Sequence, residues 1–444
     1  MNSRTQLSVF FFAFLLILYS LVFCLVFTDK RIVDFIPFYA SSQALIDHEN
    51  PYPVQEKISA NLNPPFFLLF FKPLAQLEYH TALASWTLLS LFLGLIGATI
   101  AFRCAFSDVF LKKNGFMLYL SYFAFFPILM DISIVQIGSI LFFFVMAGYH
   151  FYLKERDYYA GILWGIIISI KFFPALLFFY AFKQQRLKVC YVMFGTVFLC
   201  CLLPLLLYGF SIYQQYFSMV ARILWYGDSW NASLYGFLFR QLIDTRIKSH
   251  NLLPVETLFG VLFFIVVAIY YLRLGPKKTQ VNHQPFCLTI TAMLFLSPFG
   301  WIYYFSLLTL PLSLLIIRAF EPQRAVIFLI TLALAFFLIN FPQAYIVSRK
   351  MSDPLTKLSL FSFPFYGLLL INLLLLATPI LHGNNTMRLQ QVFYDEPRRN
   401  LAWAMLIIFG FGLVVPLNSF LIRISIPLPT YKAKYITFKN QRNE

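Results

Sequence analysis

Residues 7–27 read LSVFFFAFLLILYSLVFCLVF, a stretch without a charged side chain. An α-helix needs about 20 consecutive apolar residues to cross the hydrocarbon core of a bilayer. The segment Leu7–Phe27 is therefore long enough to span a membrane. No small-residue cleavage pattern follows it, so we interpret it as an uncleaved first membrane helix. Arg4 precedes the segment, which favours an N-terminus in the cytoplasm.

The whole chain is also strongly apolar and poor in charged residues. Of its 444 residues, 60% are hydrophobic, 20% are aromatic and only 12% are charged, and the mean hydropathy is +0.75. About one-quarter of a soluble globular domain is charged. We therefore predict an all-α polytopic membrane helical bundle and exclude a secreted enzyme, a nucleic-acid-binding domain and a disordered tail protein.

The formal net charge of +16 does not point to nucleic acid as a partner. The basic side chains lie in short loops between apolar segments, where Lys and Arg set the membrane topology and contact anionic membrane lipids. The six cysteines have no metal-binding spacing and the six histidines are dispersed, so we expect no metal site and no disulfide framework. The P-loop, G-x-S-x-G, H-E-x-x-H and dinucleotide glycine motifs are absent.

Apolar segments recur along the chain and predict about 12–13 transmembrane helices in a single integral membrane domain, residues 1–444. Charges and polar residues divide this domain into a first outer loop at 28–63, core helices within 64–208, a second large outer loop at 209–254, C-terminal helices within 255–421 and a polar tail at 422–444. No convincing internal repeat is visible, which disfavours a transporter built on duplicated halves.

The segment Tyr158–Phe182 allows two topologies. As one helix it would place Lys183, Arg186 and Lys188 outside, against the positive-inside tendency. As two short helices that meet at Lys171–Pro174, it would return to the cytoplasm. Proline interrupts a helix and disfavours the helical conformation of the residue before it, so we predict the pair of short helices.

Three ionisable residues stand at or near membrane depth on the predicted outer side, where such groups are costly and commonly functional. Asp34 fits a general base that accepts a proton from a hydroxyl, or an N-cap of a helix over Phe35–Leu45. Lys171 fits an ammonium that holds a phosphate, or a lysine that snorkels at a helix end. Asp131, with Gln136 nearby, fits a residue that orients a sugar or cation, or an N-cap.

The second outer loop mixes planar donors with aromatic rings: Arg222, Trp225, Trp230, Asn231, Arg240 and Arg246. Aromatic faces stack on sugars and Arg side chains suit phosphate, but an interfacial aromatic belt with solvated arginines has the same composition. Asn231-Ala-Ser233 matches a glycosylation sequon, a tripeptide that often occurs by chance.

The predicted cytoplasmic loops are too short to form a nucleotide-sugar domain. A donor must therefore reach an outer site through the membrane, as a lipid-linked molecule.

Several segments, in order, resemble glycosyltransferase family 87. In the first outer loop these are Asp34-Phe-Ile-Pro-Phe-Tyr39, Asn50-Pro-Tyr52, Asn63-Pro64-Pro65-Phe and Lys72-Pro73-Leu74. Further along, Gln136-Ile-Gly138-Ser resembles a G-Q-x-N segment, Gly161–Pro174 resembles G-x-x-x-G…K-x-x-P, Asn231–Gly236 resembles N-x-S-x-x-G and Ser297–Trp301 resembles S-P-x-x-W.

The resemblance spans most of residues 28–305 and implies a GT-C fold with two larger outer-face loops. It also implies a polyprenyl-phosphate sugar as donor, no metal, and Asp34 as the catalytic base. The family includes mycobacterial mannosyltransferases that extend phosphatidylinositol mannosides. Two positions depart from its pattern: Val135 stands where a glycine precedes Gln136, and Tyr303 and Tyr304 stand where a histidine often follows Trp301.

The sequence thus predicts a glycosyltransferase on the outer face of a bacterial-type inner membrane. Lys171, with Arg222 or Arg240, would hold the donor phosphate. Acceptor and sugar contacts would come from the following residues: Asp131, Gln136, Asn231, Trp301, Tyr303 and Tyr304. The partners would be the polyprenyl-phosphate sugar, a lipid or glycan acceptor and membrane lipids, with no cofactor beyond the lipid-linked donor. The alternatives are a flippase for a sugar-bearing anionic lipid and a glycan polymerase or ligase with a pyrophosphate-linked donor.

Overall fold

The computed structural model describes residues 3–29, 31, 33–53, 60–244, 251–275, 282–319, 325–346, 353–377 and 396–425. These residues form α-helices and short 3-10 helices, and no strand occurs among them. One isolated bridge pairs Asn231 with Trp301. The predicted all-α bundle is confirmed.

The helices follow one another through short turns. Up to residue 183 they are α1 (Ser3–Phe27), α2 (Phe35–Ile46), α3 (Pro65–Ala75), α4 (Tyr79–Ala105), α5 (Asp108–Ala124), α6 (Phe126–Ser133), α7 (Gly138–Leu153), α8 (Asp157–Ile170), η1 (Phe173–Ala175) and α9 (Leu176–Lys183). The next are α10 (Leu187–Tyr208), α11 (Ser211–Val220), η2 (Trp225–Gly227), α12 (Leu234–Leu242), α13 (Leu253–Arg273), α14 (Gln284–Leu296) and η3 (Ile302–Leu308). The last are α15 (Thr309–Ala319), α16 (Val326–Asn340), α17 (Gln343–Ile346), α18 (Pro354–Leu358), η4 (Leu360–Ser362), α19 (Phe363–Ala377) and α20 (Glu396–Ser425).

Seven helical segments in the described part of the chain are long and apolar enough to cross a membrane, which makes this a multi-pass membrane protein. They are Ser8–Phe27, Tyr79–Ala105, Leu187–Tyr208, Leu253–Arg273, Ile302–Ala319, Pro354–Ala377 and Asn400–Ser425. The pair α5 and α6, bent by 61°, makes an eighth if it counts as one span. The sequence predicted 12–13 spans, so the described part of the chain contains fewer full-length spans than predicted. Shorter apolar helices such as α7, α8 and α16 are not long enough to be counted among them.

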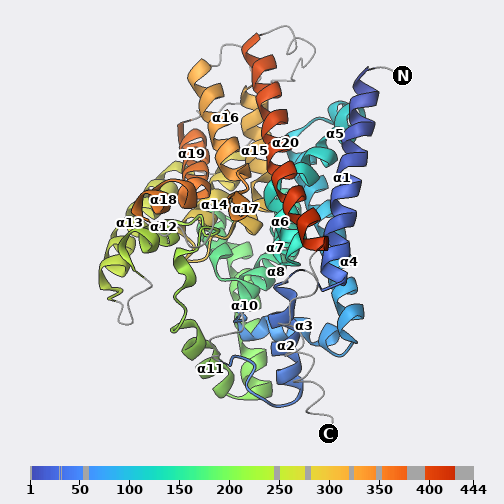
Figure 1. Cartoon of the computed structure of the whole chain (residues 1–444). Helices are drawn as coiled ribbons and strands as arrows, with labels where there is room; N and C mark the ends of the chain where they lie inside the picture. Colours follow the sequence, from blue (N-terminus) through green and yellow to red (C-terminus); the bar gives the residue numbers. More distant parts are fainter. Residues whose placement is uncertain are drawn as a thin grey trace.

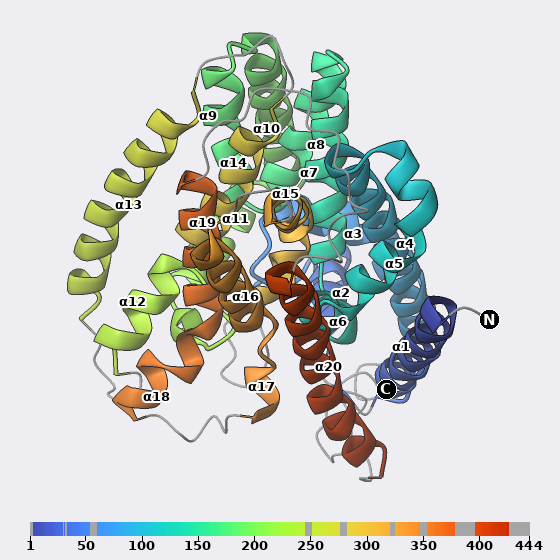
Figure 2. The ribbon, with the colours of Figure 1, turned by 90° about the horizontal axis from the view of Figure 1, so that it is seen from above.

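The elements gather into two regions of the molecule (Figure 1). Helices α2, α3 and α11 lie together at the lower end, while α15, α16 and α20 occupy the upper half. The view from above places α1 and α13 at opposite edges of the bundle (Figure 2). Helix α8 packs between α7 and α10, and α16 packs on α19 and α20.

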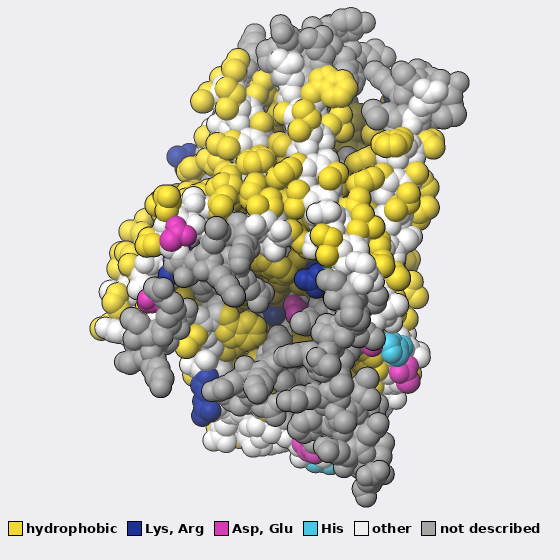
Figure 3. Space-filling view, viewed as in Figure 1, with side chains coloured by type: hydrophobic (Ala, Val, Ile, Leu, Met, Phe, Trp, Pro, Cys, Tyr) yellow, Lys and Arg dark blue, Asp and Glu magenta, His cyan; other side chains and the backbone are white. Residues whose placement is uncertain are grey.

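The surface of the upper half is dominated by hydrophobic side chains (Figure 3). Large apolar side chains are exposed on other helices too, with an exposed fraction of 73% for Phe264 on α13 and 72% for Leu206 on α10. Large exposed apolar surface of this extent suits contact with lipid rather than water.

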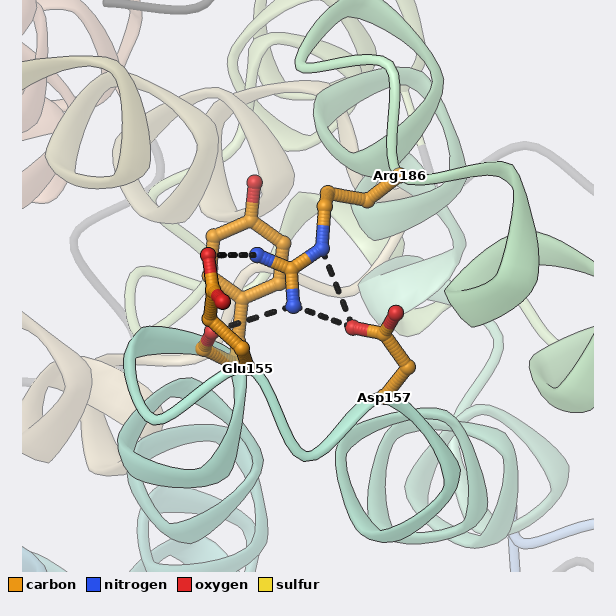
Figure 4. Close-up of polar contacts among 4 residues, drawn as sticks. Glu155, Asp157 and Arg186 are labelled. Atoms are coloured by element: carbon orange, nitrogen blue, oxygen red, sulfur yellow. Dashed lines mark hydrogen bonds and ion pairs between the residues drawn. The ribbon is translucent and has the colours of Figure 1, made fainter. Parts of the chain in front are cut away.

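Helices α8 and α9 form the predicted pair of short helices. Arg186, just after α9, donates from Nε to Asp157 Oδ1 at 3.0 Å, and Asp157 is the first residue of α8. The guanidinium also lies 4.7 Å from the centre of the Tyr152 ring and 4.0 Å from Glu155 (Figure 4). The start of α8 and the end of α9 are therefore adjacent, so the chain turns back at Lys171–Pro174 as predicted.

Candidate active site

Asp34 occupies the N-cap position of α2, but its side chain makes no capping hydrogen bond. The capping interpretation of this residue is therefore wrong. Instead, the half-buried carboxylate accepts a hydrogen bond at Oδ2 from Gln136 Nε2 at 2.7 Å. The backbone N–H of Asp34 donates to the carbonyl oxygen of Ile134 at 2.8 Å. Both contacts come from the turn that joins α6 to α7, about a hundred residues away in sequence.

Gln136 is itself held in place. Its Oε1 accepts a hydrogen bond from the Ile137 N–H at 3.0 Å, and its own N–H donates to the carbonyl oxygen of Asp131 at 3.0 Å. Because Oε1 accepts from Ile137, the side-chain nitrogen Nε2 of Gln136 points at Asp34. The structure thus shows a protein partner for Gln136, and its predicted contact with a sugar stays a prediction.

Asp131 is almost fully buried on α6 and holds the start of α7. Its Oδ1 accepts from the Gly138 N–H at 2.9 Å, and its Oδ2 accepts from the Ser139 N–H at 2.7 Å and from the Ser139 hydroxyl at 2.5 Å. The first amides of a helix lack partners within the helix. Asp131 therefore caps α7 from a distance, which favours the capping alternative for this residue over a direct contact with a sugar or cation.

Lys171 lies at the tip of the α8–α9 hairpin, in the extended residue that ends α8. Its Nζ lies 5.8 Å from the centre of the Tyr304 ring. Within the described part of the chain, Lys171 makes no side-chain hydrogen bond and no ion pair. A partly buried ammonium without a protein partner is suited to hold an anion.

The charge of Lys171 acts on Asp34. Burial raises the pKa of the Asp34 carboxyl above its ordinary value, while the Gln136 hydrogen bond and the positive charges of Lys171 and Arg31 lower it, and burial dominates. A carboxylate with a raised pKa is a better proton acceptor than one in water, because general bases act best with a pKa closer to the working pH. Figure 3 shows acidic and basic side chains together in a hollow of the surface.

The segment after α14 brings aromatic side chains to the same place. Tyr303 and Tyr304 begin η3 and are buried. The Tyr303 ring stacks on Trp301 at 6.0 Å between ring centres, and Trp301 stacks on Phe299 at 5.9 Å. Tyr304 contacts Phe173 of the hairpin at 5.3 Å. Tyr304 therefore lies beside Lys171, Tyr303 lies against Tyr304 with 4.8 Å between ring centres, and both are within electrostatic reach of Asp34.

Gly138 explains why η3 can approach so closely. A Cβ atom at this position would overlap the carbonyl oxygen of Tyr303 and would lie 2.6 Å from Asp131 Oδ1. The hydroxyl of Ser306 donates to the Gly138 carbonyl oxygen at 3.2 Å. Only glycine leaves room for this contact between η3 and the start of α7.

Asn231 ties the second outer loop to the segment before η3. Its Nδ2 donates to the carbonyl oxygens of Tyr226 and Pro298 at 2.9 and 2.8 Å, and its Oδ1 accepts from Ser233 and Gly300 N–H groups. The side chain is completely buried. Asn231 therefore acts on the site through the backbone that leads to Trp301, and its burial argues against use of the sequon.

The two arginines predicted to help Lys171 lie elsewhere. Arg222 is exposed near the end of α11. Arg240 on α12 is 3% exposed and donates from Nη1 to the carbonyl oxygens of Asp228 and Asn231, both at 2.8 Å. No contact between either arginine and Lys171 occurs among the residues that the structure covers.

Arg31 is a basic residue near Asp34 to which the sequence analysis assigned no role. Its Nε donates to the Ser133 carbonyl oxygen at 2.7 Å, and its Nη2 donates to the hydroxyls of Ser133 and Tyr345 at 2.9 and 3.0 Å. Its guanidinium carbon lies 5.0 Å from the centre of the Phe420 ring on α20. The sequence did contain a signal for Arg31, because this charged residue stands three positions before the candidate base.

Carboxylates do not converge at this site. Asp34 accepts from the Gln136 side chain, and Asp131 accepts from the first amides of α7. Among the described residues, no three His, Cys, Asp or Glu side chains are arranged to hold a metal ion.

Comparison with known proteins gives one family. The model of glycosyltransferase family 87 matches residues 61–298, slightly more than half of the chain. Comparisons with curated proteins and with solved structures gave no match. The matched region contains Gln136 and Lys171, whereas Asp34 precedes it and Tyr303 and Tyr304 follow it.

Proposed function

The chain belongs to glycosyltransferase family 87, and from this premise we propose that it moves a hexose or pentose from a polyprenyl-phosphate donor to a hydroxyl group of a lipid or glycan acceptor. That the protein is a membrane glycosyltransferase follows from its family and its membrane-spanning helices. The observation that carries the finer proposal is the electrostatic interaction of a held carboxylate, Asp34, with the ammonium of Lys171, which makes no hydrogen bond and no ion pair among the described residues.

Asp34 is the proposed general base. As the acceptor oxygen forms a bond to the anomeric carbon, its proton passes to the Asp34 carboxylate. The bond between the anomeric carbon and the phosphate oxygen breaks, and the phosphate leaves with the electron pair. One displacement with one base needs no covalent intermediate, so inversion at the anomeric carbon is the expected outcome.

Lys171 is the proposed partner of the leaving phosphate. Negative charge grows on the phosphate oxygen as the glycosidic bond breaks, and a fixed ammonium in a site of low dielectric stabilises that charge. Arg31, three residues before Asp34, also places a positive charge near the Asp34 carboxyl. Arg222 and Arg240 make no contact with Lys171 within the described residues, and their role as phosphate ligands stays a prediction.

Tyr303 and Tyr304 are the proposed contacts to the sugar or the acceptor, because their rings lie between Lys171 and the loop that carries Trp301. A phenol with an ordinary pKa near 10 is a hydrogen-bond donor at neutral pH rather than a base. The tyrosines would therefore orient hydroxyl groups while Asp34 accepts the proton.

The site is proposed to face the outside of a bacterial-type inner membrane. Arg103, Lys112 and Lys113 flank the junction of α4 with α5, and Lys154 and Arg186 lie at the base of the hairpin. Basic loops favour the cytoplasm, so the tip of the hairpin with Lys171 points the other way. A lipid-linked donor would enter from the bilayer without a nucleotide or metal at the site.

A turnover assay tests this proposal. Purified protein in nanodiscs receives radiolabelled polyprenyl-phosphate mannose, glucose or arabinose with a host lipid extract, and labelled glycolipid is measured. We expect transfer by the wild type and loss of at least a hundredfold in Asp34→Asn and Lys171→Ala. Asp47→Asn, on the exposed C-cap of the same helix, and Lys183→Ala, at the other end of α9, are matched controls that retain transfer.

The outcomes separate the alternatives. Full activity in folded Asp34→Asn would refute the assignment of the base. Transfer only when a pyrophosphate-linked donor is supplied in place of these would indicate the polymerase or ligase reaction. In proteoliposomes, labelled donor that crosses the bilayer unchanged would indicate a flippase.

A further inference from the structure

Val135 has a backbone conformation that its residue type rarely adopts. Its φ is +55°, in the left-handed region, where the Cβ of an L-residue is crowded and where a β-branched residue is a real outlier. The other described non-glycine residues with positive φ are polar: Asp29, His48, Glu155 and Gln185. Such strain persists only where the surrounding structure determines it, and it is concentrated at functional sites.

The position of Val135 relates it to Asp34. The residue before it, Ile134, accepts the Asp34 N–H, and the residue after it, Gln136, donates to the Asp34 carboxylate. Both contacts to Asp34 therefore come from the two neighbours of the strained residue. The left-handed turn at Val135 is what lets a backbone carbonyl and the following side chain reach the same aspartate.

The side chain of Val135 has a packing role that glycine lacks. It is 3% exposed and lines a small cavity together with Thr87 and Ser90 of α4. Asp131, Ile132 and Gln136 complete the lining, and the buried Ser90 hydroxyl has no hydrogen-bond partner there. The valine side chain is thus buried and borders the small space between the turn and α4.

We propose that Val135 is a positioning residue for glycosyl transfer: its buried side chain, on the α4 side of the turn, holds the turn that directs Gln136 at Asp34. This inference rests on the proposed role of Asp34 as the base. Glycine would adopt the same φ without strain, so a purely conformational requirement would make glycine the better residue. The contribution of valine is therefore its buried side chain.

The experiment compares four variants in the nanodisc assay. Val135→Gly removes both the strain and the packing, Val135→Ala keeps the left-handed cost with less packing, and Val135→Thr keeps the branched shape. Gln185→Gly is the matched control, because Gln185 is exposed, has φ +56° and lies in the turn after α9, away from Asp34. For each variant, kcat, KM for the donor, the pH profile of kcat/KM and the unfolding temperature are measured.

We expect Val135→Gly to lose ten- to a hundredfold in kcat, since small misplacements of a catalytic group have effects of that size. Its KM for the donor and its unfolding temperature should stay close to those of the wild type. The acid limb of its pH profile should move to higher pH, because a weaker Gln136 contact stabilises the Asp34 carboxylate less. Val135→Thr should match the wild type, Val135→Ala should be intermediate, and Gln185→Gly should be fully active.

The inference would be overturned if Val135→Gly kept the kcat and the acid limb of the wild type. It would also be overturned if Val135→Thr lost as much kcat as Val135→Gly. If Val135→Gly folds poorly, the comparison of Val135→Thr with Val135→Ala tests the inference. A higher kcat in Val135→Thr would support the role of the side chain, and equal kcat values in the two variants would refute it. Failure of the proposed function is recognised separately, because Asp34→Asn would then retain transfer in the same assay.

Discussion

Asp34 lies half-buried near Gln136, Lys171 and Arg31, and each of these neighbours lowers the pKa of its carboxyl while burial raises it. Burial is the larger effect, so the pKa of the carboxyl lies above that of an exposed aspartate and its carboxylate is the stronger base. Gln136 is the one neighbour that does this through a hydrogen bond, at 2.7 Å. Its removal is therefore the most direct test of how the site tunes its base.

The substitution Gln136→Leu should move the acid limb of the kcat/KM profile to higher pH. The hydrogen bond favours the charged form of Asp34, so its loss raises the pKa, and the base is then protonated at a higher pH than in the wild type. A hydrogen bond to a charged group contributes about 1.5–3 kcal/mol, which corresponds to a loss of at least tenfold in kcat/KM on the acid side. An unchanged profile would contradict this tuning, and Gln214→Leu, on the exposed face of α11, is the control.

At the scale of elements, the site depends on three segments that approach one another more closely than ordinary helix packing allows. The turn between α6 and α7 holds Asp34, the α8–α9 hairpin carries Lys171, and η3 presents Tyr303 and Tyr304. Asp131 and Gly138 form the junction of the first and third of these segments. A single methyl group added at Gly138 would therefore disturb this junction.

The substitution Gly138→Ala should lower stability by about 3 kcal/mol or more, because the new Cβ overlaps the Tyr303 carbonyl oxygen and displaces the Asp131 cap. Thermal unfolding in detergent measures this effect, and transfer activity should be lost with it. Gly195→Ala on α10 is the control, because a Cβ there meets no atom within 4 Å. Equal unfolding temperatures for the two variants would show that η3 can move away without cost.

At the scale of the whole molecule, the site draws on helices beyond the family match at residues 61–298. Arg31 follows α1 and contacts Tyr345 of α17 and Phe420 of α20. The C-terminal helices therefore support the region around Asp34, although they carry no motif that could be read in the sequence.

The substitution Tyr345→Phe should lower kcat a few-fold and destabilise the protein by about 1 kcal/mol, because Arg31 loses one of its hydrogen bonds. Activity and thermal unfolding measured together test this link. Tyr366→Phe is the matched control, since its hydroxyl donates to the Leu358 carbonyl oxygen at 2.7 Å without contact to Arg31. A loss of kcat in both variants alike would argue against a specific role of the α17 contact.

The orientation of the molecule is tested by labelling of single cysteines in a background without the six native free cysteines. Asp47→Cys, after α2, should react with a membrane-impermeant maleimide in intact cells. Lys154→Cys, at the base of the hairpin, should react only after permeabilisation. The reverse pattern would place Asp34 and Lys171 on the cytoplasmic side and would exclude an outer-face donor.

Much of this protein could be predicted from its sequence, because membrane insertion depends on local composition. The apolar run at Leu7–Phe27, the break at Lys171–Pro174 and the all-α class follow from the cost of burying charge and from the geometry of proline. The ordered family motifs likewise led to glycosyltransferase family 87, and the family model confirmed it.

Only the tertiary structure decided which polar groups meet. The sequence left Asp34 between a base and a cap, and the structure shows that its side chain accepts from Gln136 and makes no capping hydrogen bond, so its role as the base stays a proposal. Asp131 proved to cap α7, and Arg240 donates to backbone carbonyls of the second outer loop. The contacts of Arg31 with α17 and α20, and the left-handed conformation of Val135 beside Asp34, appear only in the tertiary structure. The physical reason is that hydrophobicity acts on each segment separately, while hydrogen bonds and charge pairs depend on distances of a few ångströms between segments far apart in the chain.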